Sequence, residues 1–121
     1  MKTWKELRDE ILRLGAQEES RYERDPMLFI EAIDRAVIIA CTALGEPLPD
    51  LPSLPSQDGQ PLPLSREAAT AVPLLAAFYV FEDEDERKAV RWREDAYDLL
   101  RRFAAERRGR AVVLENSGIY S

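Results

Sequence analysis

The residues most able to take part in chemistry are five consecutive acids, Glu82, Asp83, Glu84, Asp85 and Glu86. Carboxylates are the ligands that hard cations prefer, so this run could be read as a metal site. The glycine and the ligand spacing of a calcium-binding loop are missing, however. The run follows an apolar segment and precedes an amphipathic one, where acids favour the start of a helix. We expect a solvated acidic turn that caps a helix; a contact patch for another molecule is the alternative.

The second charged group lies about twenty residues further on and contains five arginines within ten residues: Arg101, Arg102, Arg107, Arg108 and Arg110. Such a cluster could bind phosphate, or it could be the polar end of a helix in a chain of net charge −6. A third interpretation is mutual recognition, in which the acids of one copy meet the arginines of the next. Head-to-tail contacts of this kind form rings when the rotation between copies closes.

Other reactive groups are scarce. The chain has no histidine and one cysteine, Cys41, which lies in an apolar helical context and is expected to be a core residue. The absence of histidine excludes Ser-His-Asp triads and most zinc and iron sites. With five glycines and no phosphate-binding motif, a nucleotide loop is not credible. We therefore expect no enzyme, no catalytic residue, no metal and no cofactor.

The elements that position these groups are helices. Thr3 and Glu6 form a capping-box pattern before a helix over 4–14, with Gly15 expected as its left-handed C-cap. Residues 16–24 are expected to form a loop anchored by Tyr22. Asp25-Pro26 then begins a helix over 26–44 that ends at Gly45, and its second half is apolar almost all round.

Residues 46–64 contain six of the eight prolines, which exclude a helix or a central strand. We expect an extended crossover with a turn at 57–60 that lies against the body; a flexible linker is the alternative. Ser65 caps a third helix, in which Pro73 either produces a kink or begins a new helix. A fourth helix begins near Asp83 or Asp85 and ends at Gly109, with Trp92, Ala96, Leu99 and Phe103 on its inward face.

The last twelve residues change character. Val112, Val113 and Leu114 are β-prone, and Ile119 and Tyr120 form a second apolar group. A lone strand has no partner in a helical domain. We expect a domain over 1–109, a small all-α bundle of about four helices, followed by an extended C-terminal arm over 110–121 that pairs with another protein; a frayed tail is the alternative.

Four segments resemble the head-to-tail adaptor (connector, or head-completion) proteins of tailed phages: Trp4-Lys-Glu-Leu7, Asp25-Pro26-Met-Leu-Phe-Ile-Glu-Ala-Ile33, Leu74-Leu-Ala-Ala-Phe-Tyr-Val-Phe-Glu-Asp83 and Trp92-Arg-Glu-Asp-Ala-Tyr97. Together with the Pro-rich crossover they extend over roughly residues 3–105. The crossover over 46–64 is longer than the family pattern.

The resemblance implies a structural virion protein, a helical subunit of a ring that is usually dodecameric. That ring lies between the portal protein and the tail-completion (stopper) protein, and double-stranded DNA passes through it without tight binding. The resemblance also implies a terminal arm that grips the portal or a neighbour, a role to which 110–121 is the matching segment. The protein would be made in the host bacterial cytoplasm and end in the neck of the virion.

Composition agrees with a soluble partner-binding chain. The net charge of −6 argues against sequence-independent binding to nucleic acid, which depends on lysine and arginine. No apolar run reaches the roughly 20 residues that span a bilayer, and the N-terminus has no apolar core of a signal peptide. The alternative function is a small acidic regulatory module, of the antitoxin or nucleic-acid-mimic type, that binds one host protein.

Overall fold

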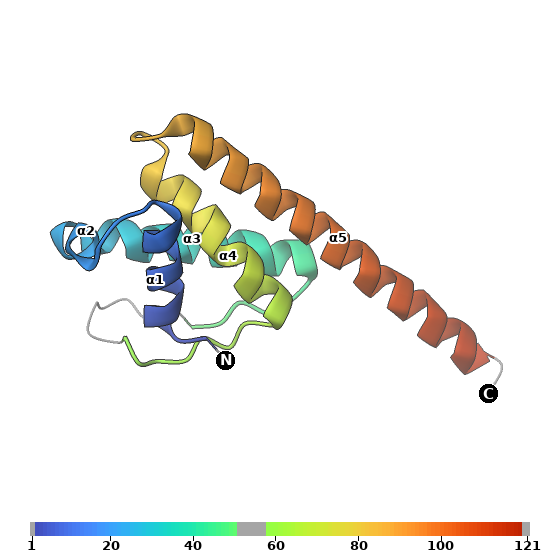
Figure 1. Cartoon of the computed structure of the whole chain (residues 1–121). Coiled ribbons are helices and arrows are strands. Elements are labelled where there is room, and N and C mark those ends of the chain that lie inside the picture. The colour runs from blue at the N-terminus through green and yellow to red at the C-terminus, as the bar shows by residue number, and fades with distance from the viewer. Residues whose placement is uncertain (1, 51–57, 120–121) are drawn as a thin grey trace.

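The computed structural model describes residues 2–50 and 58–119, with the side chains of 111–119 left out of the description. Within these residues the chain forms five helices and no strand. They are α1 (Trp4–Leu14), α2 (Glu19–Arg24), α3 (Pro26–Leu44), α4 (Arg66–Phe81) and α5 (Glu86–Ile119). Figure 1 shows α4 at the centre of the bundle, between α1, α3 and α5. The small all-α bundle expected from the sequence is confirmed.

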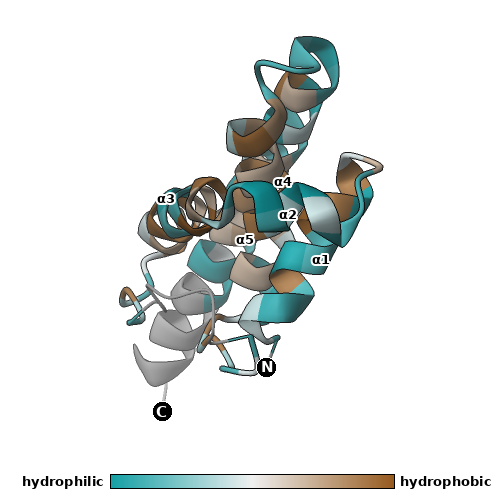
Figure 2. Ribbon diagram, turned by 90° about the vertical axis from the view of Figure 1, so that its left-hand side faces the viewer, coloured by the Kyte–Doolittle hydropathy of each residue, from teal (hydrophilic) through white to brown (hydrophobic). Residues whose placement is uncertain are grey.

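The core forms around α4, which is buried on nearly every side. Small residues on α4, including Ala68, Ala71, Ala76 and Ala77, are fully buried and let the neighbouring helices approach closely. Larger side chains from α1 and α3 fill the remaining space, among them Leu7, Ile11, Phe29, Ile33 and Val37. Figure 2 shows this division: hydrophobic residues concentrate on α3 and α4, while α5 carries many hydrophilic ones.

A continuous series of aromatic rings crosses the core. Trp4 contacts Tyr22, Tyr22 contacts Phe29, Phe29 contacts Phe81 and Phe81 contacts Trp92, with ring centroids 5.5 to 6.5 Å apart. Each contact is edge-to-face, the geometry that the ring quadrupoles favour. The series connects all five helices, so Tyr22 is the anchor that the sequence predicted.

The local start and stop signals of the helices are mostly confirmed. Thr3 and Glu6 form the capping box, the carboxylate of Asp25 accepts from the Leu28 amide, and Ser65 Oγ accepts from the Ala68 amide. Gly45 ends α3 with a φ of 68°, in the left-handed region where glycine is favoured.

Gly15 does not have the predicted left-handed conformation. Its φ is −83°, and Ala16 has the positive φ instead, at 52°. A Cβ at Gly15 would lie 2.5 Å from the ring of Phe81. Glycine therefore permits close approach of α4 rather than a left-handed turn.

The expected loop over 16–24 is wrong in part, because Glu19–Arg24 form the helix α2. A six-residue helix is not stable alone, so tertiary contacts must hold it. Two are visible: Tyr22 is buried in the aromatic series, and Arg8 of α1 binds the carboxylate of Glu19 at 3.0 Å. Neither contact can be read from local sequence pattern.

Arg8 is the one buried charged residue in the described part of the chain, with 1% of its surface exposed. Its second amino group binds Asp58 of the crossover at 2.7 Å, and its guanidinium lies 4.1 Å from the centre of the Tyr22 ring. Arg8 therefore joins α1, α2 and the crossover at one point. No local pattern in the sequence distinguishes Arg8 from the exposed arginines.

Residues 58–64 of the crossover lie against the body, as expected, whereas Leu48 in the first part of the crossover is 58% exposed. Residues 58–62 pair with the N-terminal segment through the Lys5 and Trp4 amides, which donate to the carbonyls of Asp58 and Gln60 at 3.0 Å. Leu62 is 1% exposed. The predicted turn is seen at Asp58–Gly59, while residues 51–57 lie outside the described residues.

Pro73 lies inside one continuous helix, so no new helix begins at this residue. Proline has no amide hydrogen to donate to the carbonyl four residues earlier, at Ala69. The ammonium of Lys2 donates to that carbonyl at 3.4 Å and also binds Glu10 at 2.7 Å. The N-terminal segment thus satisfies part of the bonding that Pro73 removes.

The largest correction concerns the C-terminus. Gly109 does not end α5, and the backbone is helical from Glu86 to Ile119, so the arm over 110–119 is not extended. One glycine costs a helix only about 1 kcal/mol relative to alanine. Arg107 and Arg110, on either side of Gly109, both approach Glu67 of α4, at 3.1 and 4.0 Å. In Figure 1 this part of α5 continues past the other helices.

Candidate functional site

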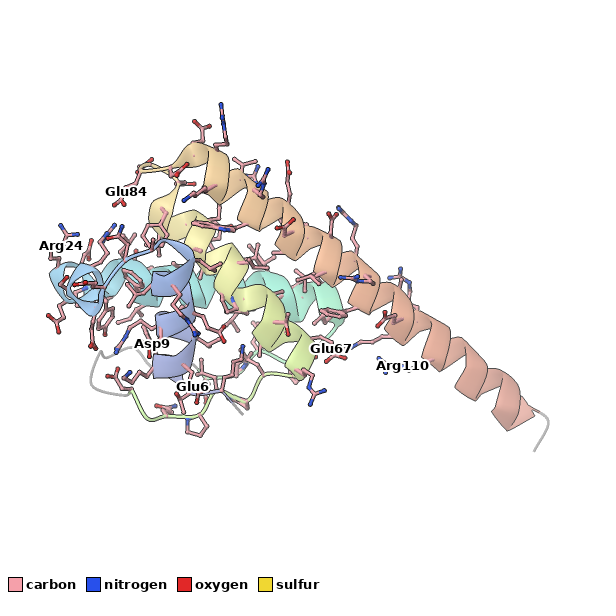
Figure 3. All side chains as sticks on the ribbon, viewed as in Figure 1. Glu6, Asp9, Arg24, Glu67, Glu84 and Arg110 are labelled. Carbon is pink, nitrogen blue, oxygen red and sulfur yellow. The ribbon has the colours of Figure 1, made fainter. Side chains whose placement is uncertain are left out.

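The acidic run forms the connection between α4 and α5. Glu82 ends α4, and the carboxylate of Asp85 accepts from the Lys88 amide at 3.2 Å at the start of α5, as a helix cap does. All five acidic side chains are exposed. Glu84, which Figure 3 labels beside this connection, binds Arg21 of α2 at 2.7 Å. The predicted solvated turn that caps a helix is confirmed.

Two surface hollows flank Glu82 and Asp83. The larger, of about 450 Å³, lies between α4 and α5 and is lined by Phe78, Glu82, Asp83, Glu86, Val90 and Arg93. The smaller, of about 230 Å³, lies between α3 and α4. It is lined by Leu28, Glu31, Ala32, Arg35, Tyr79, Glu82 and Asp83.

Each hollow has an arginine over an aromatic ring. Arg93 lies 4.6 Å from the centre of the Phe78 ring, and Arg35 lies 5.0 Å from that of Tyr79. Partial burial raises the pKa of Tyr79 above its ordinary value of 10.0, so its hydroxyl is protonated and can donate. Because Arg93 and Arg35 already lie over the rings, the exposed carboxylates are the groups of each hollow that suit a cationic side chain from another molecule.

The arginine cluster divides into two groups, which the sequence did not separate. Arg107 is an internal clamp: it binds Glu46 at 2.7 Å, Glu67 at 3.1 Å and the Leu44 carbonyl at 3.2 Å. The hydrogen bond to Glu46 is the main reason that its pKa is raised. The pKa of Glu67 is lowered, first by the bond from its own amide and then by Arg107. Arg110 adds a longer contact to Glu67, at 4.0 Å.

The other three arginines face solvent. Arg101 pairs with the exposed Asp98 three residues earlier, and Arg102 lies 6.0 Å from the centre of the Phe103 ring. Arg108 is exposed, and no ion pair with the described side chains of residues 2–50 and 58–110 holds it. These three can reach another molecule without first breaking a bundle contact.

A single copy does not bring the acidic run and the exposed arginines together. They lie at opposite ends of the bundle-forming part of α5, and Arg101 lies fifteen positions after Glu86 along the helix. That distance is about 22 Å at 1.5 Å per residue. Direct contact between the two groups therefore requires a second molecule.

The remaining predicted contact residues are in the C-terminal segment. Val112, Val113, Leu114 and Ile119 belong to the helical backbone of α5, and Tyr120 lies outside the described residues.

Several surface residues of interest were missed by sequence reasoning. Tyr97 of α5 is 37% exposed, and Met27 of α3 is 49% exposed. Ile38, which is 45% exposed, lies in the second half of α3 that was predicted to be apolar almost all round. Phe78, Tyr79, Arg35 and Arg93 form the aromatic and cationic walls of the hollows. The spacing of Glu86, Val90, Arg93 and Tyr97, at three and four residues, was a signal that could have identified them as one helical face.

In the described residues, no group of three or more acidic, cysteine or histidine side chains could hold a metal ion. No helix in this part of the chain combines the length and apolar character needed to cross a bilayer. Cys41 is buried, and burial raises the pKa of its thiol above the ordinary 9.0.

Comparison with protein families, with characterised proteins and with solved structures finds no match for this chain.

Proposed function

We propose that the protein is a non-enzymatic structural subunit, a head-to-tail adaptor that forms a ring beneath the portal of a tailed phage. The observation that carries this proposal is the separation of charge along α5. An exposed acidic turn precedes the helix, and exposed Arg101, Arg102 and Arg108 lie about 22 Å or more further along it. A rigid helix with opposite charges at its two ends is suited to repeated contacts between identical copies.

The internal clamp of Arg107 supports this interpretation. By binding Glu46 and Glu67 it fixes α5 against the ends of α3 and α4. The exposed arginines therefore have a defined position relative to the acidic turn. A fixed angle between two complementary surfaces is the condition for a closed ring rather than an irregular aggregate.

The net charge of −6 fits a passage for DNA. Acidic walls repel phosphate groups, and few contacts to phosphate mean weak, sequence-independent affinity. DNA would then move through the ring without being retained. The ring would be dodecameric and would contact the portal on one side and the tail-completion protein on the other.

The C-terminal segment is the proposed contact with the portal. Its contacts to the bundle in the described side chains end with the 4.0 Å approach of Arg110 to Glu67. An exposed ion pair of that length contributes little to stability. Deletion of residues 110–121 should therefore leave the bundle folded but prevent incorporation into particles. Normal incorporation of the shortened chain would contradict the role of this segment.

The proposal is tested by measuring where the chain is found. Tailed particles from the source strain would be purified on a density gradient, and the chain quantified against portal and capsid proteins by mass spectrometry. A copy number close to that of the portal supports the adaptor. Absence from intact particles, with the chain in a soluble complex with one host protein, would contradict it and favour the acidic regulatory module.

A further inference from the structure

One face of α5 has an ordered arrangement around Tyr97. Counting four, seven and eleven residues back gives Arg93, Val90 and Glu86, and the same steps forward give Arg101, Ala104 and Arg108. At 100° per residue, all of these positions lie within about 40° of Tyr97 around the helix. They therefore form one stripe, with Tyr97 at its midpoint.

The chemistry of this stripe changes sign from one end to the other. Glu86, together with Glu82 and Asp83, forms the acidic wall of the 450 Å³ hollow. Arg108, at the same distance on the other side of Tyr97, is exposed. Between the two ends lie partly exposed Val90 and Ala104, which are small enough for two helices to approach closely.

We propose that two free copies of this chain pair through α5 in antiparallel orientation, about a two-fold axis at Tyr97. The two Tyr97 rings meet at the axis, Val90 of each copy contacts Ala104 of the other, and Arg108 of each copy enters the acidic hollow of the other. Because the axis is two-fold, each of these contacts except the central one occurs twice.

The charge pattern selects a second copy as the occupant. A different partner would have to present a cation and an acid at the spacing found here. A second copy carries the same two groups at the same spacing, because its sequence is identical. Glu86 and Arg108 are twenty-two residues apart, which places them about 33 Å apart along the helix. Tyr97 is 37% exposed and belongs to a residue type that concentrates binding energy at the centre of interfaces.

One pair in this register is unfavourable, because Arg93 faces Arg101 of the other copy. The repulsion is reduced by their neighbours: Arg93 lies over the Phe78 ring, and Arg101 pairs with Asp98. This detail gives a directional test. Arg101→Glu should strengthen the pair by placing an acid opposite Arg93. If only the net charge of −6 mattered, the same substitution would make each chain more acidic, increase the repulsion between copies and weaken the pair.

The inference stands on the α5 face alone and does not depend on the adaptor ring. It does have a consequence for the ring, since both assemblies need the acidic turn and Arg108. A two-fold pair would prevent free subunits from assembling into rings too early. Ring formation on a template would then require the pair to separate.

The geometry is tested by crosslinking across the axis. A Tyr97→Cys variant should oxidise readily to a covalent dimer, since a disulfide forms only when the two Cα atoms are within about 7 Å. Arg91→Cys is the matched control, exposed on the same helix but about 120° away from Tyr97. Cys41 is buried and should not interfere. Equal crosslinking of the two variants would overturn the proposal.

The charges are tested by light scattering and sedimentation of the full chain at low salt. The wild type should be a dimer at high micromolar concentration. Glu86→Arg and Arg108→Glu should each weaken the dimer about tenfold, because each reversal acts twice per dimer, and the double variant should recover it. Circular dichroism would verify that every variant is folded. A monomeric wild type would refute the pair, and failure of the double variant to recover would refute its register, while adaptor incorporation is measured separately in particles.

Discussion

Arg8 provides the most demanding test of the structure, because the buried charge and its partners should respond differently to substitution. The guanidinium is buried, whereas its partners Glu19 and Asp58 have side chains that are 57% and 41% exposed. Its Nε already has no hydrogen-bond partner in the described residues. Neutralising both partners leaves a buried cation with no counter-charge, while removing Arg8 leaves two carboxylates that water can reach.

The expected order of the two losses of stability follows from these exposed fractions. Arg8→Met keeps the apolar volume and loses two ion pairs and the stacking on Tyr22, which should cost about 1 to 2 kcal/mol. The Glu19→Gln, Asp58→Asn double variant should cost about 3 kcal/mol, toward the lower end of the range for breaking a buried pair. For a chain of this length, that difference corresponds to several degrees in Tm.

Urea unfolding followed by circular dichroism measures both losses of stability. The dependence of the unfolding free energy on urea concentration should be the same in each variant, because only then do the midpoints compare stability. Asp9→Asn is the matched control, because Asp9 pairs with Lys5 on the exposed surface of the same helix and should change stability very little. A double variant that is as stable as Arg8→Met, or more stable, would refute the reasoning that Arg8 is a buried cation dependent on its two acids.

Three further predictions concern glycine, pH and the thiol. Gly15→Ala should lower stability by about 1 to 3 kcal/mol through its clash with Phe81, whereas Gly109→Ala, which has open space around its Cβ, should raise it by up to about 1 kcal/mol; urea midpoints measure both. Glu67 has a folded pKa below its ordinary 4.5, so its contribution is present above that value and is lost as pH falls through the folded pKa. The acid sensitivity of unfolding between about pH 5 and 3 should therefore decrease in Glu67→Gln, and an unchanged pH profile would show that the carboxylate is not stabilised in the fold. Cys41 is 1% exposed with a raised thiol pKa, so its modification by a thiol reagent should be slow in buffer and fast in urea; fast modification in buffer would contradict its burial.

The amino-acid sequence by itself determined the helices whose signals are local. The capping box of Thr3 and Glu6, the Asp25-Pro26 start, the Gly45 stop and the Ser65 cap all act within four residues, so a linear pattern contains the whole interaction. The acidic turn before α5 was predictable for the same reason.

The tertiary structure decided the features that depend on distant residues. The helix α2 exists because Tyr22 and Glu19 contact α1 and α3, and α5 continues past Gly109 where Arg107 and Arg110 approach Glu67. The sequence could not separate Arg107, which is an internal clamp, from Arg108, which faces solvent. Adjacent residues point about 100° apart on a helix, and only packing shows which direction faces the protein. The candidate interface is therefore a property of the fold, although every residue in it is visible in the sequence.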